Sequence, residues 1–129
     1  MRAIDTNVIV RFLTGDDPDQ AARARRLIEG GDIFVATSVV LESEWVLRSG
    51  YEFPAERIVN ALRAFAGLPG VVFEDGALIA RALDWVEAGM DFADALHLGR
   101  ADGCAAFMSF DRKLSRIAAR LSDVEVVAP

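Results

Sequence analysis

The chain has 129 residues, of which 53% are hydrophobic and 26% are charged, and its formal net charge at pH 7 is −6. This composition is typical of a globular domain and excludes a disordered tail. The negative charge argues against a simple basic nucleic-acid binder, but not against a nuclease, because metal ions can mediate between carboxylates and a phosphate. We therefore expect one domain that spans residues 1–129.

Membrane and disulfide signals are weak in this sequence. The longest apolar runs are too short to span a bilayer, and the N-terminus lacks the basic region and apolar core of a secretory signal. We therefore expect a cytoplasmic protein with no membrane partner. The single cysteine, Cys104, excludes an internal disulfide, and its small neighbours favour a buried hydrophobe over a reactive thiol.

Short apolar runs alternate with amphipathic segments along the chain. Asp17, Pro18 and Gln20 carry the N-cap, first-turn and capping-box signals of a helix, and Thr37 and Ser38 are expected to cap the helix after the second strand. The predicted strands are residues 3–5, 33–36, 71–73, 105–110 and 124–127. The predicted helices are residues 8–13, 18–29, 39–49, 54–66, 76–88, 91–103 and 112–121.

This alternation predicts an α/β fold, because parallel strands are connected by helices that cover both faces of the sheet. We expect a three-layer α/β/α domain with a central, mostly parallel sheet of four to five short strands. In such sheets the carboxyl ends of the strands share one edge, and ligands bind there.

Five carboxylates lie where this architecture would gather them. Asp5 ends the first strand, Glu42 lies one turn into the helix after the second strand, Asp91 and Asp94 begin a helix, and Asp111 follows the fourth strand. Clustered like charges oppose folding unless cations compensate them. Mg²⁺ prefers oxygen ligands, and two such ions can support phosphodiester hydrolysis.

Several of these carboxylates also have a simpler interpretation. Asp91 and Asp111 could each be an ordinary helix N-cap, and Asp94 could be favoured by the helix dipole alone. His97, one turn after Asp94, is interpreted as a packing or supporting residue because no Ser or Cys nucleophile accompanies it.

Glu42 and Glu44 point in nearly opposite directions from their helix. Glu44 has Arg48 four residues later, a surface ion pair that explains it without a site. Glu42 has no such partner, so we favour Glu42 as the site residue.

Polar residues beside the carboxylates are candidates for a supporting role. Thr6 and Asn7 follow Asp5 and could orient it or a phosphate, and Ser109 stands in the same relation to the fourth strand. Arg11 and Arg112 are candidates for binding the substrate backbone, because a guanidinium suits bidentate phosphate contacts.

Five segments match one known family in the same order, and they cover nearly the whole chain. They are Ile4-Asp5-Thr6-Asn7-Val8, the stretch from Arg11 through Gly15-Asp16-Asp17-Pro18, Leu41-Glu42-Ser43-Glu44-Trp45-Val46-Leu47, Asp91-Phe92-Ala93-Asp94-Ala95-Leu96-His97 and Ser109-Phe110-Asp111-Arg112. Together they resemble the PIN-domain ribonucleases, and among these the VapC-type toxins of bacterial type II toxin–antitoxin systems.

The resemblance implies an endoribonuclease that depends on one or two Mg²⁺ or Mn²⁺ ions and hydrolyses RNA with a metal-activated water. It implies Asp5, Glu42, Asp94 and Asp111 as the catalytic, metal-binding acids, with Asp91 as a frequent addition. It also implies a cognate VapB-type antitoxin whose tail lies over the site, and homodimers that can pair further.

Three alternatives fit less well. A haloacid-dehalogenase phosphatase would have a second Asp where Asn7 stands. A receiver domain would have an acidic pair before the first strand's Asp and a Lys after a late strand, whereas the only lysine is Lys113, two residues past Asp111. The non-enzymatic alternative is a PIN-like binding module, and the intact acidic set argues against it.

Overall fold

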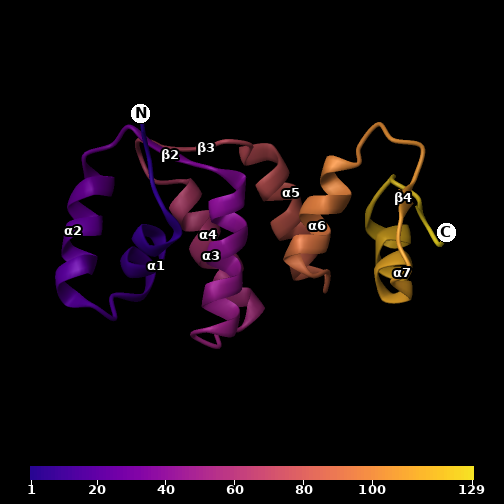
Figure 1. The fold of residues 1–129 in the computed structure, drawn as a ribbon, viewed down its shortest axis with the longest axis horizontal. Helices are drawn as coiled ribbons and strands as arrows, with labels where there is room; N and C mark the ends of the chain where they lie inside the picture. The colour runs from indigo at the N-terminus through magenta and orange to yellow at the C-terminus, as the bar shows by residue number, and fades with distance from the viewer. The chain divides into compact units, whose positions relative to one another are not determined.

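The computed structural model describes residues 1–129, which form seven helices and five short strands (Figure 1). The chain divides into two compact units, an N-terminal unit, Met1–Gly76, and a C-terminal unit, Ala77–Pro129. Every strand pairing is parallel, with three strands bonded in the N-terminal unit and two in the C-terminal unit. The predicted α/β class is therefore confirmed. No helix combines the length and the apolar character that crossing a membrane requires.

The sheet of the N-terminal unit has the order β1-β2-β3. Its strands are β1 (Arg2–Ala3), β2 (Ile33–Val35) and β3 (Val71–Phe73), and its helices are α1 (Thr6–Thr14), α2 (Pro18–Glu29), α3 (Thr37–Ser49) and α4 (Ala55–Ala66). Ile33 and Val35 on the central strand are completely buried, as expected for β-branched residues covered on both faces. The Ile4 amide continues the ladder by donating to the Phe34 carbonyl at 3.2 Å, which brings the chain to the edge of the sheet just before Asp5.

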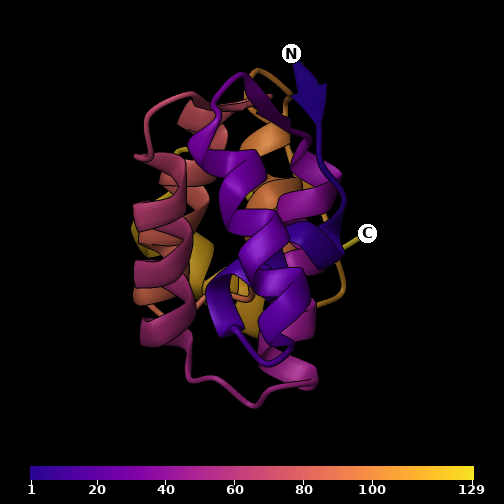
Figure 2. The ribbon, with the colours of Figure 1, turned by 90° about the vertical axis from the view of Figure 1, so that its left-hand side faces the viewer.

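Helices α1 and α2 form a hairpin and pack side by side (Figures 1 and 2). Gly15 ends α1 in the left-handed conformation, with φ of 66°. Asp17 then accepts a hydrogen bond from the Gln20 amide at 3.0 Å, and Pro18 occupies the first position of α2. The predicted start of α2 is confirmed.

The predicted start of α3 is wrong. The helix begins at Thr37, and Ala36 occupies the N-cap position without a side-chain bond. The Thr37 amide instead donates to Glu74 Oε1 at 2.8 Å, so a residue that follows β3 satisfies this helix end. The Thr37 hydroxyl is buried without a hydrogen-bond partner.

Two glycines allow close contact between the loops before β2 and β3. Gly70 has a φ of 76°, and a Cβ atom on it would lie only 2.6 Å from the Cα of Gly31. The Gly70 carbonyl accepts from the Ile33 amide at 2.8 Å, which aligns β3 with β2. A side chain at position 70 would therefore displace the backbone that sets this register.

The C-terminal unit contains most of α5 (Gly76–Glu87), together with α6 (Phe92–Arg100), β4 (Phe107–Met108), α7 (Arg112–Leu121) and β5 (Val126–Val127). The bounds of α7 are those predicted from the sequence. Helix α6 ends three residues earlier than predicted, and β4 is shorter because it pairs with only two residues of β5. Cys104 is exposed, so its predicted burial is wrong.

Candidate active site

Asp5 lies on the N-terminal unit where the chain leaves the sheet and α1 begins. Ile4 before it is buried, and Asp5 itself is exposed. Asp5 Oδ1 accepts from the Thr6 amide at 2.8 Å as the N-cap of α1, and Oδ2 makes no hydrogen bond. The end of the apolar run thus places a carboxylate with one unused oxygen at the helix start.

Thr6 makes hydrogen bonds to both candidate acids of the N-terminal unit, Asp5 and Glu42. Its hydroxyl donates to Glu42 Oε1 on α3, 36 residues away, in a short hydrogen bond. Only 6% of Thr6 is exposed, so its position is fixed by packing, while Glu42 is exposed. The sequence suggested that Thr6 orients Asp5 or a phosphate; its amide does contact Asp5, but its hydroxyl orients Glu42 instead.

Glu44 forms the predicted ion pair with Arg48, with Nε 2.9 Å from Oε2. The pair is not the surface pair that we expected, because only 5% of Glu44 is exposed. The choice of Glu42 over Glu44 is consistent with this geometry, since Glu44 is engaged by Arg48 while Glu42 faces a pocket.

A pocket of about 380 Å³ surrounds these groups, and we call it the Asp5 pocket. It is lined by Asp5, Thr6, Asn7, Val10, Arg11, Glu42, Val46 and Tyr51. Arg11, predicted to contact substrate, lies on its wall. Tyr51 was not singled out from the sequence, because one tyrosine after a helix-ending glycine carries no periodic signal.

The three candidate acids of the C-terminal unit, Asp91, Asp94 and Asp111, lie at the starts of α6 and α7. Asp91 Oδ2 accepts from the Asp94 amide at 3.1 Å as the N-cap of α6, and Asp111 Oδ1 accepts from the Leu114 amide at 3.0 Å as the N-cap of α7. Ser109 Oγ accepts from the Asp111 amide at 3.0 Å and so fixes the turn. The capping interpretation is therefore confirmed for both residues. Capping uses one oxygen of each carboxylate and leaves the other free for a ligand.

Asp94 is a partly buried carboxylate with two other acids near it. Partial burial raises the pKa of Asp94, the negative charges of Asp91 and Asp111 raise it further, and His97 opposes them. His97 is exposed rather than packed. The three carboxylates are therefore close enough to repel one another.

These acids line a second pocket of about 200 Å³, which we call the Asp94 pocket. Its lining comprises Gly89, Met90, Asp91, Asp94, Asp111, Lys113, Leu114 and Ile117. Lys113, the only lysine of the chain, is the one basic residue of this lining. Arg112 is the exposed first residue of α7.

The predicted site residues thus fall into two sets, one in each unit. Asp5, Thr6, Asn7, Arg11 and Glu42 line the Asp5 pocket, and Asp91, Asp94 and Asp111 line the Asp94 pocket. Neither unit by itself holds three Asp, Glu, His or Cys side chains arranged to bind a metal ion. The donors in both pockets are carboxylate oxygens, several without a hydrogen bond, and this donor chemistry fits Mg²⁺ or Mn²⁺.

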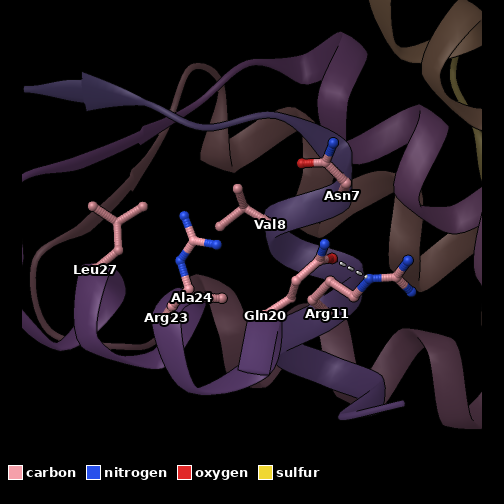
Figure 3. Close-up of a pocket in the computed structure, with 7 residues that line it drawn as sticks. All are labelled: Asn7, Val8, Arg11, Gln20, Arg23, Ala24 and Leu27. Atoms are coloured by element: carbon pink, nitrogen blue, oxygen red, sulfur yellow. Dashed lines mark hydrogen bonds between the residues drawn. The ribbon is translucent and has the colours of Figure 1, made fainter. Parts of the chain in front are cut away.

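A further pocket of about 370 Å³ lies between α1 and α2, and we call it the α1–α2 pocket. Figure 3 shows the side chains that line it and the hydrogen bond that Arg11 Nε donates to Gln20 Oε1. Its lining comprises Asn7, Val8, Arg11, Gln20, Arg23, Ala24 and Leu27. Asn7 and Arg11 therefore line both this pocket and the Asp5 pocket.

Comparison with known proteins gives one family. The chain matches the PIN domain over residues 3–120, which is nearly its whole length. No curated protein matches the chain. PIN domains are generally nucleases that use divalent metal ions and act on RNA. With acids at the starts of α1, α6 and α7 and a match that covers these elements, the chain belongs to the PIN domain family.

Proposed function

We propose that the protein is a metal-dependent endoribonuclease built as a single PIN domain over residues 1–129. The observation that carries this proposal is the placement of carboxylates with unused oxygens at exposed helix starts. Asp5 and Asp111 each cap a helix with one oxygen and leave the second without a hydrogen bond. Asp, Asn and Ser cap a helix about equally well, but only Asp leaves a second, charged oxygen of the kind that Mg²⁺ prefers.

Four acids are assigned to catalysis and metal binding: Asp5, Glu42, Asp94 and Asp111. Asp91 is assigned to metal binding beside Asp94. One or two Mg²⁺ or Mn²⁺ ions, when bound, would supply an activated water and stabilise the charge on the leaving oxygen.

Neighbouring residues have supporting roles in this proposal. The Thr6 hydroxyl fixes one oxygen of Glu42 and leaves the other for a cation. Ser109 holds the turn that presents Asp111. Asn7, Arg11 and Arg112 contact the phosphate backbone of the RNA; such contacts position a strand but do not read its sequence.

The biological role proposed is that of a VapC-type toxin in the cytoplasm. The support for it is the ordered set of sequence segments that resemble these toxins. The proposal includes a VapB-type antitoxin as partner and a homodimer that can pair further. Expression of the wild-type chain should arrest bacterial growth, and Asp5→Asn should not; equal arrest by both would contradict the toxin role.

The direct test of the enzyme is cleavage of RNA by the purified protein with Mn²⁺, followed by sequencing of the new RNA ends. The proposal predicts defined ends that are absent with EDTA and absent with Asp5→Asn. Asp19→Asn is a matched control, because Asp19 is an exposed carboxylate on α2 outside both acid-lined pockets. Defined ends that persist in EDTA would contradict the metal dependence, and the absence of new ends would favour the binding-module alternative.

A further inference from the structure

Arg11 occupies the wall between the Asp5 pocket and the α1–α2 pocket. It lies on α1, and about a third of its side chain is exposed. Arg11 is the one basic residue that lines both pockets.

Several hydrogen bonds hold the Arg11 guanidinium. Nη1 donates to Asp16 Oδ1 at 2.9 Å, to Asp16 Oδ2 at 3.0 Å and to the Tyr51 hydroxyl at 3.1 Å. Nε donates to Gln20 Oε1 at 2.8 Å (Figure 3). Nη2 makes no hydrogen bond, so its two N–H groups remain available to a ligand.

The acceptors of Arg11 are themselves fixed. The Tyr51 hydroxyl donates to Asp16 Oδ2 in a short hydrogen bond, and the Thr14 hydroxyl donates to Asp16 Oδ1 at 2.9 Å. These hydrogen bonds, first of all that from Tyr51, hold the pKa of Asp16 below its usual value. The left-handed turn at Gly15 brings Asp16 back toward the last turn of α1.

Arg23 shows what an unrestrained arginine looks like in the same region. Arg23 lines the α1–α2 pocket, and its ion pair with Asp19 has a long N–O distance of 3.7 Å. The side chain of Arg23 is 68% exposed and that of Asp19 is 81% exposed. Such an exposed ion pair does little to hold the Arg23 side chain in one conformation. An unrestrained arginine loses side-chain entropy when a ligand immobilises it. Arg11 is already restrained before any ligand arrives, which lowers the cost of binding.

We propose that Asp16, Tyr51 and Gln20 are positioning residues that hold Arg11 so that Nη2 binds a phosphate of the RNA strand adjacent to the Asp5 pocket. This inference rests on the proposed endoribonuclease function. The ligand is a backbone phosphate, because the two available N–H groups of Nη2 suit phosphate oxygens. The three residues act through Arg11 and do not touch the RNA.

The first test is the salt dependence of RNA binding, measured by fluorescence anisotropy with a short single-stranded RNA and Mg²⁺. Asp94→Asn is the parent, so that cleavage does not interfere. Adding Arg11→Ala should weaken binding about tenfold or more. It should also reduce the slope of log K against log salt by up to about 0.7, the value for one phosphate contact on a single strand. Arg25→Ala is the control for loss of one charge, because Arg25 lines neither pocket.

The second test is a double-mutant cycle on cleavage kinetics. Tyr51→Phe removes one hydroxyl and should raise KM for RNA several-fold while kcat stays within about twofold. In the Arg11→Ala background, Tyr51→Phe should have no further effect, because its action passes through Arg11. Arg11→Lys should also raise KM, since an ammonium keeps the charge but not the planar fork.

The outcomes separate this inference from the proposed function. If the wild type cleaves RNA but Arg11→Ala leaves the salt slope unchanged, the phosphate site is refuted and the nuclease stands. If Tyr51→Phe has its full effect in the Arg11→Ala background, the positioning role is refuted. If the wild type does not cleave but Arg11→Ala lowers the slope, the phosphate site stands and the catalytic proposal falls.

Discussion

The hydroxyl of Thr6 offers a sharp test of how Glu42 is prepared for a metal ion. Thr6→Val removes the group that donates to Glu42 Oε1 and keeps the shape of the side chain. Thr6 is only 6% exposed, and valine has the same branched shape, so the substitution leaves no cavity in the buried space. Any effect on Glu42 therefore arises from the lost hydrogen bond.

The expected magnitudes differ for stability and for metal binding. A hydrogen bond to a charged group contributes about 1.5–3 kcal/mol, but water can replace the donor at an exposed carboxylate, so we expect a loss of about 1 kcal/mol in the free energy of unfolding. A residue that orients a metal ligand typically changes metal affinity by about 10- to 100-fold. This change corresponds to about 1.4–2.7 kcal/mol, so metal binding should lose more free energy than folding does.

Mn²⁺ affinity is measured by titration in a calorimeter, and the free energy of unfolding is measured by urea denaturation. Thr37→Val is a matched control, because the Thr37 hydroxyl is buried without a partner. It should leave Mn²⁺ affinity unchanged and raise stability by about 1 kcal/mol. Unchanged Mn²⁺ affinity in Thr6→Val, in a protein whose wild type binds Mn²⁺, would refute the assigned role of Thr6.

Three further predictions concern stability. The pKa of Asp94 is raised by burial and by Asp91 and Asp111, so its ionised form destabilises the metal-free fold. Asp94→Asn should raise Tm in EDTA at neutral pH, and this gain should vanish below the ordinary aspartate pKa of about 3.9; an equal gain at every pH would contradict it. The pKa of Asp16 is lowered instead, so its ionised form stabilises the fold. This stabilisation is present above the ordinary aspartate pKa and is lost as the pH falls below it. The Tm difference between wild type and Asp16→Asn should thus narrow on acidification, and a constant difference would count against the network. Gly70→Ala should cost about 2–4 kcal/mol in urea denaturation, because it adds a backbone clash to the left-handed strain. Gly15→Ala, with open space around its Cβ, should cost only about 1–2 kcal/mol, and equal losses would refute the clash.

Local signals predicted much of the fold. The start of α2 and both bounds of α7 follow from capping residues and apolar periodicity, and the structure has them at those positions. The start of α3 could not be predicted, because Glu74 satisfies the Thr37 amide from 37 residues away. The extent of β4 was overestimated, because strand length is set by the partner strand rather than by the apolar run itself.

The candidate site shows the same division. The sequence predicted which acids stand at strand ends and helix starts, since that depends on local pattern. It did not predict that Thr6 binds Glu42, nor that Tyr51 joins Asp16 in holding Arg11, because these contacts link residues 35 or more positions apart. Long-range side-chain contacts depend on how the helices pack, and periodicity does not specify them.

Cleavage of a defined RNA by wild type and Asp94→Asn, with Mn²⁺ and at matched protein concentration, shows whether Asp94 takes part in metal-dependent hydrolysis. The proposed function predicts that Asp94→Asn loses cleavage while its circular dichroism spectrum and cooperative unfolding are retained, and that Asp19→Asn cleaves like the wild type. Full activity in Asp94→Asn, or cleavage by the wild type that persists in EDTA, would contradict the account.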